Sequence, residues 1–138
     1  MSKITLQRKE NVFVLTMNAG ENRFNPQFLR DLNNALDVVE KCPDEVALVS
    51  TSSSKYYSNG LDLKWMSEQK ESEVNELAIG FLQLIRRILS FPVPTVAAVN
   101  GHSYAGGFMM MMAHDYRSVG LGHIFSIVNS DKGWLCLP

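Results

Sequence analysis

The residues best suited to chemistry lie in a glycine-bearing stretch, Gly101–Gly107, between an apolar run and a run of methionines. Backbone N–H groups are unpaired where a helix begins, and the helix N-terminus adds a positive partial charge there. A glycine N–H in such a place, here that of Gly106, can stabilise negative charge on an ester or thioester oxygen. The alternative is that Gly106 and Gly107 only allow a helix to pack closely on a strand.

The same stretch contains a candidate nucleophile, Ser103. Residues Gly101–Ala105 nearly match the G-x-S-x-G elbow of hydrolases, in which the helix follows the serine directly. Here the paired glycines come between the serine and the predicted helix. A triad also needs an acid and a histidine downstream, and few such residues remain: His114, Asp115, His123 and Asp131. A serine hydrolase is therefore the lesser alternative.

The patterns around these residues predict a layered α/β fold with helices against a sheet. The β-branched run Thr95–Val99 predicts a buried strand before the glycines, and Phe108–Ala113 predicts a buried helix after them. Asn59-Gly60 predicts a tight turn, and Asp62 can cap a short helix after it. Alternation and helical spacing predict the other elements: a hairpin of Ile4–Arg8 and Val12–Met17, a helix from Asn25 to about Lys41, strands at Val46–Thr51 and Tyr116–Val119, and a helix at Glu71–Ser90.

The composition is that of a globular chain and excludes several classes of function. Of the 138 residues, 46% are hydrophobic and 20% are charged, which suits one domain with a buried core. A net charge of −1 gives no reason to expect nucleic acid as a partner. The cysteines, Cys42 and Cys136, and the histidines lack metal-ligand spacing, so no metal site is expected. The sequence shows no signal peptide and no membrane span, which predicts an intracellular protein.

Three segments taken together resemble the crotonase superfamily, the enoyl-CoA hydratase/isomerase proteins. They are Glu21–Asn25, Tyr57–Leu63 and Pro94–Asp115, in the order and at the spacing that the family shows. Within the superfamily they look most like the plant-type peroxisomal Δ3,Δ2-enoyl-CoA isomerases. The resemblance covers nearly the whole chain and implies the N-terminal part of a spiral of ββα units, with residues 1–138 forming one incomplete domain.

The resemblance also implies a site. In this family the carbonyl of an acyl-CoA thioester lies between two backbone N–H groups, which correspond here to those of Leu61 and Gly106. These donors hold the enolate that forms when a base removes a proton from the α-carbon. Coenzyme A is part of the substrate, so no separate cofactor is implied. The remaining positions that the resemblance assigns to substrate binding are Arg23, Phe24, Tyr57, Ser58, Asn59, Gly60, Asp62, Leu63, Tyr104 and Gly107.

Several side chains near these positions have two interpretations. Arg23 and Lys55 are candidates for contacts with the phosphates of coenzyme A, although surface cations more often only interact with solvent. Asp62 fits a helix cap better than a catalyst. Trp65 and Met66 fit either the acyl channel or core packing.

Met109 separates the two reactions of the family. Hydratases carry a glutamate at the corresponding position, one of two that act on a water molecule. An apolar Met109 cannot activate water, whereas moving a double bond needs only one base that takes a proton at C2 and returns one at C4. The resemblance therefore implies an isomerase acting in fatty acid β-oxidation.

The chain departs from the family pattern at its C-terminal end. The isomerase base is a glutamate that follows a segment like Gly133–Pro138, and this chain ends at Pro138. The segment Gly120–Asn129 also looks inserted. We therefore expect a truncated chain that turns over little, and the alternative to an isomerase is an inactive form that binds acyl-CoA or full-length subunits. The resemblance implies a peroxisomal homotrimer for the full-length protein; without a targeting signal in this chain, the cytoplasm is the other expectation.

Overall fold

The computed structural model describes residues 3–127, and its main sheet follows from the alternating sequences. The predicted hairpin is confirmed: β1 (Ile4–Lys9) and β2 (Val12–Met17) pair antiparallel. The predicted strands β3 (Ala47–Ser52), β5 (Thr95–Val99) and β7 (Tyr116–Val119) are also present and extend the sheet in parallel. The resulting order is β1-β2-β3-β5-β7.

A second, smaller sheet was not predicted. It contains three short parallel strands in the order β4-β6-β8: Tyr56–Ser58, His102–Tyr104 and Phe125–Ser126. Each of them follows one of the parallel strands of the main sheet along the chain, so a long strand, a short strand and a helical segment recur as a ββα spiral. Strands of two or three residues are too short for an alternating pattern to reveal.

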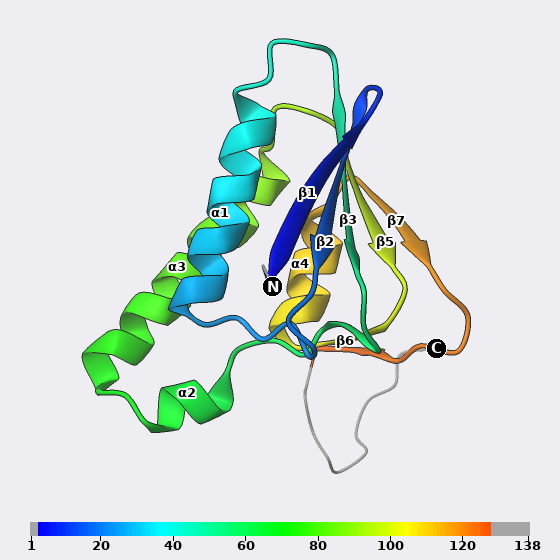
Figure 1. The fold of residues 1–138 in the computed structure, drawn as a ribbon. Coiled ribbons are helices and arrows are strands. Elements are labelled where there is room, and N and C mark those ends of the chain that lie inside the picture. The colour runs from blue at the N-terminus through cyan, green and yellow to red at the C-terminus, as the bar shows by residue number, and fades with distance from the viewer. Residues whose placement is uncertain (1–2, 128–138) are drawn as a thin grey trace.

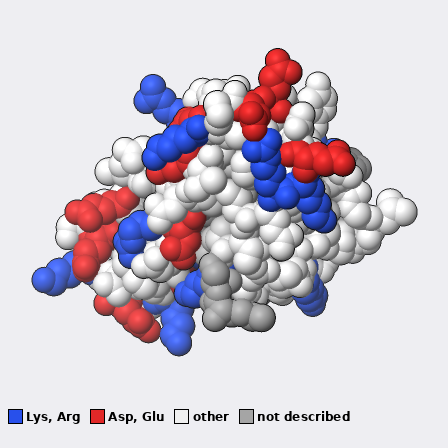
Figure 2. All heavy atoms as spheres, turned by 45° about the horizontal axis from the view of Figure 1, so that its top comes forward, with Lys and Arg blue, Asp and Glu red and all other residues white. Residues whose placement is uncertain are grey.

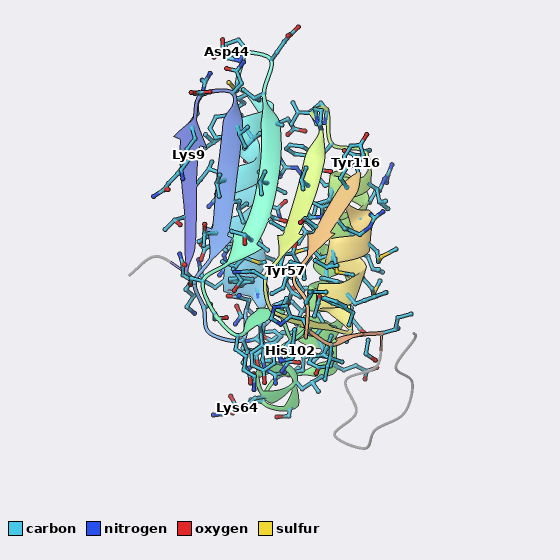
Figure 3. All side chains as sticks on the ribbon, turned by 90° about the vertical axis from the view of Figure 1, so that its right-hand side faces the viewer. Lys9, Asp44, Tyr57, Lys64, His102 and Tyr116 are labelled. Carbon is cyan, nitrogen blue, oxygen red and sulfur yellow. The ribbon has the colours of Figure 1, made fainter. Side chains whose placement is uncertain are left out.

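Two of the helices, α1 and α2, begin at the predicted capping residues. The side chain of Asn25 accepts a hydrogen bond from Phe28 N at the start of α1, and that of Asp62 accepts one from Trp65 N at the start of α2. The two longest helices and α4 lie on one side of the main sheet (Figures 1 and 3). The bounds within the described residues are Pro26–Glu40 for α1, Leu63–Ser67 for α2, Glu71–Leu89 for α3 and Gly106–Ala113 for α4.

The core lies between the sheet and these helices. Alternate residues of β2, β3 and β5 face it, which is the period-two pattern of strands with one buried face. The largest fully buried apolar side chains come from both layers: Phe24, Phe28, Leu15, Met17, Leu32, Leu48, Leu84, Val39 and Val99. Three polar residues, Ser50, Ser52 and Thr95, share the buried face of the strands.

The prediction that the methionine-rich helix is buried is correct for one face only. Met110 and Met111 are buried, whereas Met109 and Met112 are 39% and 48% exposed. Because every residue from Phe108 to Ala113 is apolar, the sequence contains no polar positions that would distinguish the two faces.

The surface carries charges of both signs. Basic and acidic side chains are interspersed on the face shown in Figure 2, in keeping with the net charge of −1. Arg87, for example, bridges Asp37 and Glu40 at 2.6 and 2.7 Å and so joins α3 to α1. None of the helices in residues 3–127 combines the length and the apolar character needed to cross a membrane.

Candidate functional site

The turn after β4 is held by hydrogen bonds to the loop before α1. Phe24 N donates to Gly60 O, and Asp62 N donates to Phe24 O, each at 2.9 Å. Ser58 Oγ donates to Asn22 O at 2.8 Å. Gly60 has φ of +79°, as the Asn-Gly signal predicts, because only glycine adopts that region without strain. The turn therefore has a fixed shape, with the Leu61 N–H between two anchored peptides.

This turn touches the start of α4, although the two are far apart in the sequence. A Cβ placed on Gly60 would lie 3.0 Å from Gly106 N and 3.1 Å from Ala105 Cβ. Ala105, the N-cap, has φ of +46°, a region that non-glycine residues rarely occupy and that is often found at functional sites. The structure thus brings together the Gly60–Leu61 peptide and the N-terminus of a helix.

Both candidate donors are available at this contact. Within residues 3–127, Leu61 N donates to no backbone acceptor. Gly106 is the first residue of α4, where the N–H groups have no partner inside the helix. Two N–H groups from different segments therefore lie near one another beside the helix N-terminus.

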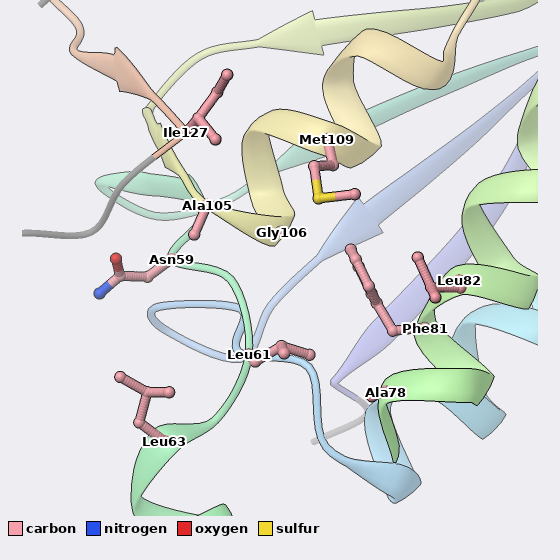
Figure 4. Close-up of a pocket in the computed structure, with 10 residues that line it drawn as sticks. All are labelled: Asn59, Leu61, Leu63, Ala78, Phe81, Leu82, Ala105, Gly106, Met109 and Ile127. Atoms are coloured by element: carbon pink, nitrogen blue, oxygen red, sulfur yellow. The ribbon is translucent and has the colours of Figure 1, made fainter. Parts of the chain in front are cut away.

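Leu61 and Gly106 both line an apolar pocket of about 360 Å³. Leu61 and Leu63 come from the turn and from α2, Phe81 comes from α3, and Met109 comes from α4 (Figure 4). Asn59 is the one lining residue with a polar side chain among those that the structure describes. The full lining is Asn59, Leu61, Leu63, Ala78, Phe81, Leu82, Ala105, Gly106, Met109 and Ile127. Such a pocket suits an acyl chain better than a charged group.

Besides Gly60, four of the residues predicted to bind substrate are buried but do not line this pocket. Phe24 is fully buried and packs on Phe81, with ring centroids 4.9 Å apart. Tyr57 is also fully buried, and its hydroxyl bonds to a serine of β3 rather than facing a ligand. Ser58 holds the turn, and a Cβ on Gly107 would lie 2.2 Å from Ser58 O. Gly107 therefore provides the close packing that was the alternative interpretation of the paired glycines.

Arg23 and Asp62 lie together in a second, polar pocket of about 470 Å³. Arg23 pairs with Glu21, and this hydrogen bond lowers the pKa of the Glu21 carboxyl. Asp62 also accepts a hydrogen bond from Asn25 Nδ2 at 3.2 Å. The other two candidate residues lie elsewhere: Tyr104 stacks on His102, and Lys55 lies over the ring of Tyr56.

The geometry gives no support to a hydrolase. Ser103 is fully buried, and its Oγ has no hydrogen-bond partner among the described residues. A serine nucleophile needs a base within hydrogen-bond reach. His114, one of the histidines considered for a triad, bonds to a different serine, Ser50.

Sequence reasoning did not predict the roles of three buried polar residues near the site. Asn22 holds the strand that precedes the turn, and Ser50 and His114 form a hydrogen-bonded chain with Tyr57. Ser50 and His114 are 64 residues apart, so no local pattern connects them. The only available signal was a serine among the apolar residues of a strand and a histidine at the end of an apolar helix.

A ββα spiral with an apolar pocket between a glycine turn and a helix N-terminus defines a crotonase-like protein. The comparisons with known proteins agree. The profile of the enoyl-CoA hydratase/isomerase family matches residues 7–134, and the chain belongs to this family.

Similar proteins carry both names of the family. Over 115 residues the chain is 33% identical to enoyl-CoA delta isomerase 1, peroxisomal, of Arabidopsis thaliana, covering 81% of this chain and 48% of that protein. An enoyl-CoA hydratase of Mycobacterium ulcerans superposes with a TM-score of 0.83 at 27% identity, covering 90% of this chain and 54% of the other. An enoyl-CoA isomerase of Mycobacterium tuberculosis superposes with a TM-score of 0.81 at 30% sequence identity, covering 89% of this chain and 53% of the other. The chain thus spans about half the length of the relatives that it matches.

Proposed function

We propose that this chain binds the carbonyl of an acyl-CoA thioester between the N–H groups of Leu61 and Gly106. We further propose that the reaction it serves moves the double bond of a 3-enoyl-CoA to the trans-2 position in fatty acid β-oxidation. The observation that carries the proposal is the contact between the Gly60–Leu61 turn and the start of α4, beside a pocket that both of them line. The family membership supports the same substrate class.

The chemistry follows from where negative charge develops. A base removes a proton from C2, and the electrons of the broken C–H bond move toward the thioester oxygen to give a dienolate. The same proton, or another, is then returned at C4, which leaves the double bond between C2 and C3. Two N–H donors and the α4 N-terminus stabilise the oxygen while it carries this charge. Loss of one such donor raises the barrier by about 2.7–4 kcal/mol.

The apolar lining favours isomerisation over hydration. Met109 lies in the pocket, where a water-activating hydratase would need a carboxylate. Arg23, in the polar pocket beside the turn, would meet the phosphates of coenzyme A. The name of the Arabidopsis relative is the support for a peroxisomal setting.

A second candidate function is binding without turnover. None of the pocket-lining residues within the described part of the chain has a carboxylate or another basic side chain. A chain of this kind would hold an acyl-CoA, or associate with full-length subunits, without abstracting a proton.

The binding proposal is tested by titrating the 138-residue protein with 2,4-hexadienoyl-CoA. Hydrogen bonds to the thioester oxygen draw electrons along the conjugated chain, so the absorbance of the bound ligand moves to longer wavelength. Hexyl-CoA, a thioether without the carbonyl, is the matched control and should bind about ten-fold more weakly. Equal binding of the two ligands with no absorbance shift would contradict the proposal.

A separate assay with 3-hexenoyl-CoA distinguishes the two candidate functions. Formation of the conjugated 2-enoyl product supports an isomerase, and binding without product supports the binding-only chain. Conversion of trans-2-hexenoyl-CoA, the substrate that hydration requires, to a 3-hydroxyacyl product would instead show hydration and overturn the argument from Met109.

A further inference from the structure

A buried chain of hydrogen bonds connects the two segments that carry the candidate donors. Tyr57 Oη lies 2.7 Å from Ser50 Oγ, which lies 2.8 Å from His114 Nε2. His114 Nδ1 lies 2.9 Å from Met110 O, inside α4. The three side chains come from β4, from β3 and from the residue after α4, and each residue is at most 3% exposed. None of them lines the apolar pocket.

The direction of every hydrogen bond in this chain follows from its last member. Met110 O can only accept, so Nδ1 of His114 carries the hydrogen. In the neutral ring Nε2 then accepts from the Ser50 hydroxyl, and Ser50 Oγ accepts from the Tyr57 hydroxyl. Burial lowers the pKa of His114 and raises that of Tyr57, which keeps both groups neutral. Each buried proton of the chain therefore has an acceptor.

The two ends of this hydrogen-bond chain determine which segments of the protein it can position. Tyr57 lies in β4, which leads into the turn that contains Leu61, and His114 directly follows the helix that begins with Gly106. At its other end α4 rests on the same turn, since a Cβ on Gly107 would overlap Ser58 O. A helix of this length, about 12 Å, moves nearly as a rigid rod, so a shift at its C-terminal end displaces the N-terminal N–H groups.

We propose that Tyr57, Ser50 and His114 are positioning residues, which set the separation and direction of the Leu61 and Gly106 N–H groups through this chain. The proposal rests on the function proposed above. Two donors act together on one oxygen only if both stay within hydrogen-bond distance of it, so a small displacement of α4 weakens the pair. A network that only stabilised the fold would leave the geometry of the donors unchanged.

The deciding variant is Tyr57→Phe, because it cuts the link to the turn and keeps both the aromatic ring and the Ser50–His114 bond. Its matched control is Tyr56→Phe, the same deletion at the neighbouring, partly exposed residue, whose ring packs against His102 and Tyr104. In Tyr57→Phe we expect the amide NMR resonances of Leu61 and Gly106 to move together. We also expect a smaller absorbance shift of bound 2,4-hexadienoyl-CoA and about five- to ten-fold weaker binding. Tyr56→Phe should match the wild type in the amide resonances, in the absorbance shift and in the binding affinity.

Two further variants test the centre of the chain. Ser50→Ala leaves the Tyr57 hydroxyl and His114 Nε2 without their partner and should have the larger effect. Ser50→Thr restores a hydroxyl and should recover most of the absorbance shift. If Ser50→Ala fails to fold, Tyr57→Phe still decides the question.

The outcomes separate this inference from the function on which it rests. Unchanged Leu61 and Gly106 resonances and an unchanged ligand spectrum in Tyr57→Phe, even with lower stability, would overturn the positioning role. A wild-type protein that shifts no dienoyl absorbance would overturn the proposed function. In that case, coupled movement of the two amide resonances in Tyr57→Phe would still show that the chain positions them.

Discussion

At the scale of single residues, Asn22 shows how one buried amide holds the site. It is fully buried and has φ of +49°, a region that asparagine tolerates better than most residues. Its Nδ2 lies 3.0 Å from Ser52 Oγ and 3.1 Å from Tyr57 O, and its Oδ1 accepts from Ala19 N at 2.8 Å. The loop before α1 is thereby fastened to the strand that leads into the turn.

Replacement of Asn22 by alanine should destabilise the protein by about 2–4 kcal/mol. The change leaves Tyr57 O and Ala19 N without their partner and forces alanine into the left-handed region. Urea unfolding measures the loss. Asn18→Ala is the control, because its amide makes one 3.3 Å bond to Thr5 and should change stability by less than about 1 kcal/mol. Equal effects of the two variants would contradict the role of Asn22.

The sequence analysis placed Asn22 only within Glu21–Asn25, one of the segments that carry the family resemblance, and did not predict this role. Its acceptors lie 30 to 35 residues further along the chain. The nearby signals that the structure confirms, such as the Asn25 cap and the turn at Gly60, act within a few residues. Local chemistry is readable from the sequence, whereas a buried polar contact depends on how distant segments pack.

At the scale of elements, the packing of α4 on the turn after β4 creates the site. The helix approaches so closely that its second residue, Gly107, lies directly over the Ser58 carbonyl. Paired glycines signalled such an approach, but the sequence did not show which glycine provides the contact and which presents an N–H group. The structure separates them: Gly107 faces the Ser58 backbone, and Gly106 lines the pocket.

Gly107→Ala should therefore push α4 away from the turn. Its Cβ would lie 2.2 Å from Ser58 O, and a backbone atom cannot move aside as a flexible side chain can. We expect about 1–3 kcal/mol of destabilisation, together with weaker binding of 2,4-hexadienoyl-CoA. The measurements are urea unfolding and the ligand titration.

Gly80→Ala is the matched control for this variant. Gly80 lies in the middle of α3, and its Cβ would meet only Leu29 Cδ1 at an ordinary 3.4 Å. Alanine should stabilise this helix by about 0.5–1 kcal/mol and leave ligand binding unchanged. A Gly107→Ala protein that behaves like Gly80→Ala would show that α4 does not need the close approach.

At the scale of the whole molecule, the long strands and helices were predictable and the way they meet was not. Alternation and capping residues marked β1, β2, β3, β5 and α1 because each pattern extends over several residues. The small sheet was missed, although it joins Tyr56, His102 and Phe125 across the base of the spiral. The family resemblance supplied the pairing of Leu61 with Gly106, which no local pattern contains.

The same packing makes stability depend on pH, chiefly through His114. Burial lowers its pKa in the folded protein. The hydrogen bond to Met110 O and the charge of Asp115 oppose this effect, and the charge of Arg117 adds to it. The unfolded chain therefore binds a proton near pH 6.5, where the folded protein does not. Stability should fall as the pH drops below about 6.5, by at most about 1.4 kcal/mol per pH unit, until the folded protein is also protonated. Protonation would also turn Nε2 into a donor and reverse the Ser50–Tyr57 chain.

The variant His114→Gln tests whether His114 causes this dependence of stability on pH. Urea unfolding between pH 5 and 8 should show a flatter pH dependence than the wild type, whatever the variant's absolute stability, because glutamine does not titrate. His102→Gln is the comparison, since burial, His123 and Lys55 also lower the pKa of that partly exposed ring. We expect His102→Gln to flatten the dependence of stability on pH less than His114→Gln does, because a partly exposed ring exchanges protons with little effect on folding. An unchanged slope in His114→Gln would mean that the buried histidine is protonated in the folded state, and the hydrogen-bond direction assigned to the chain would be wrong.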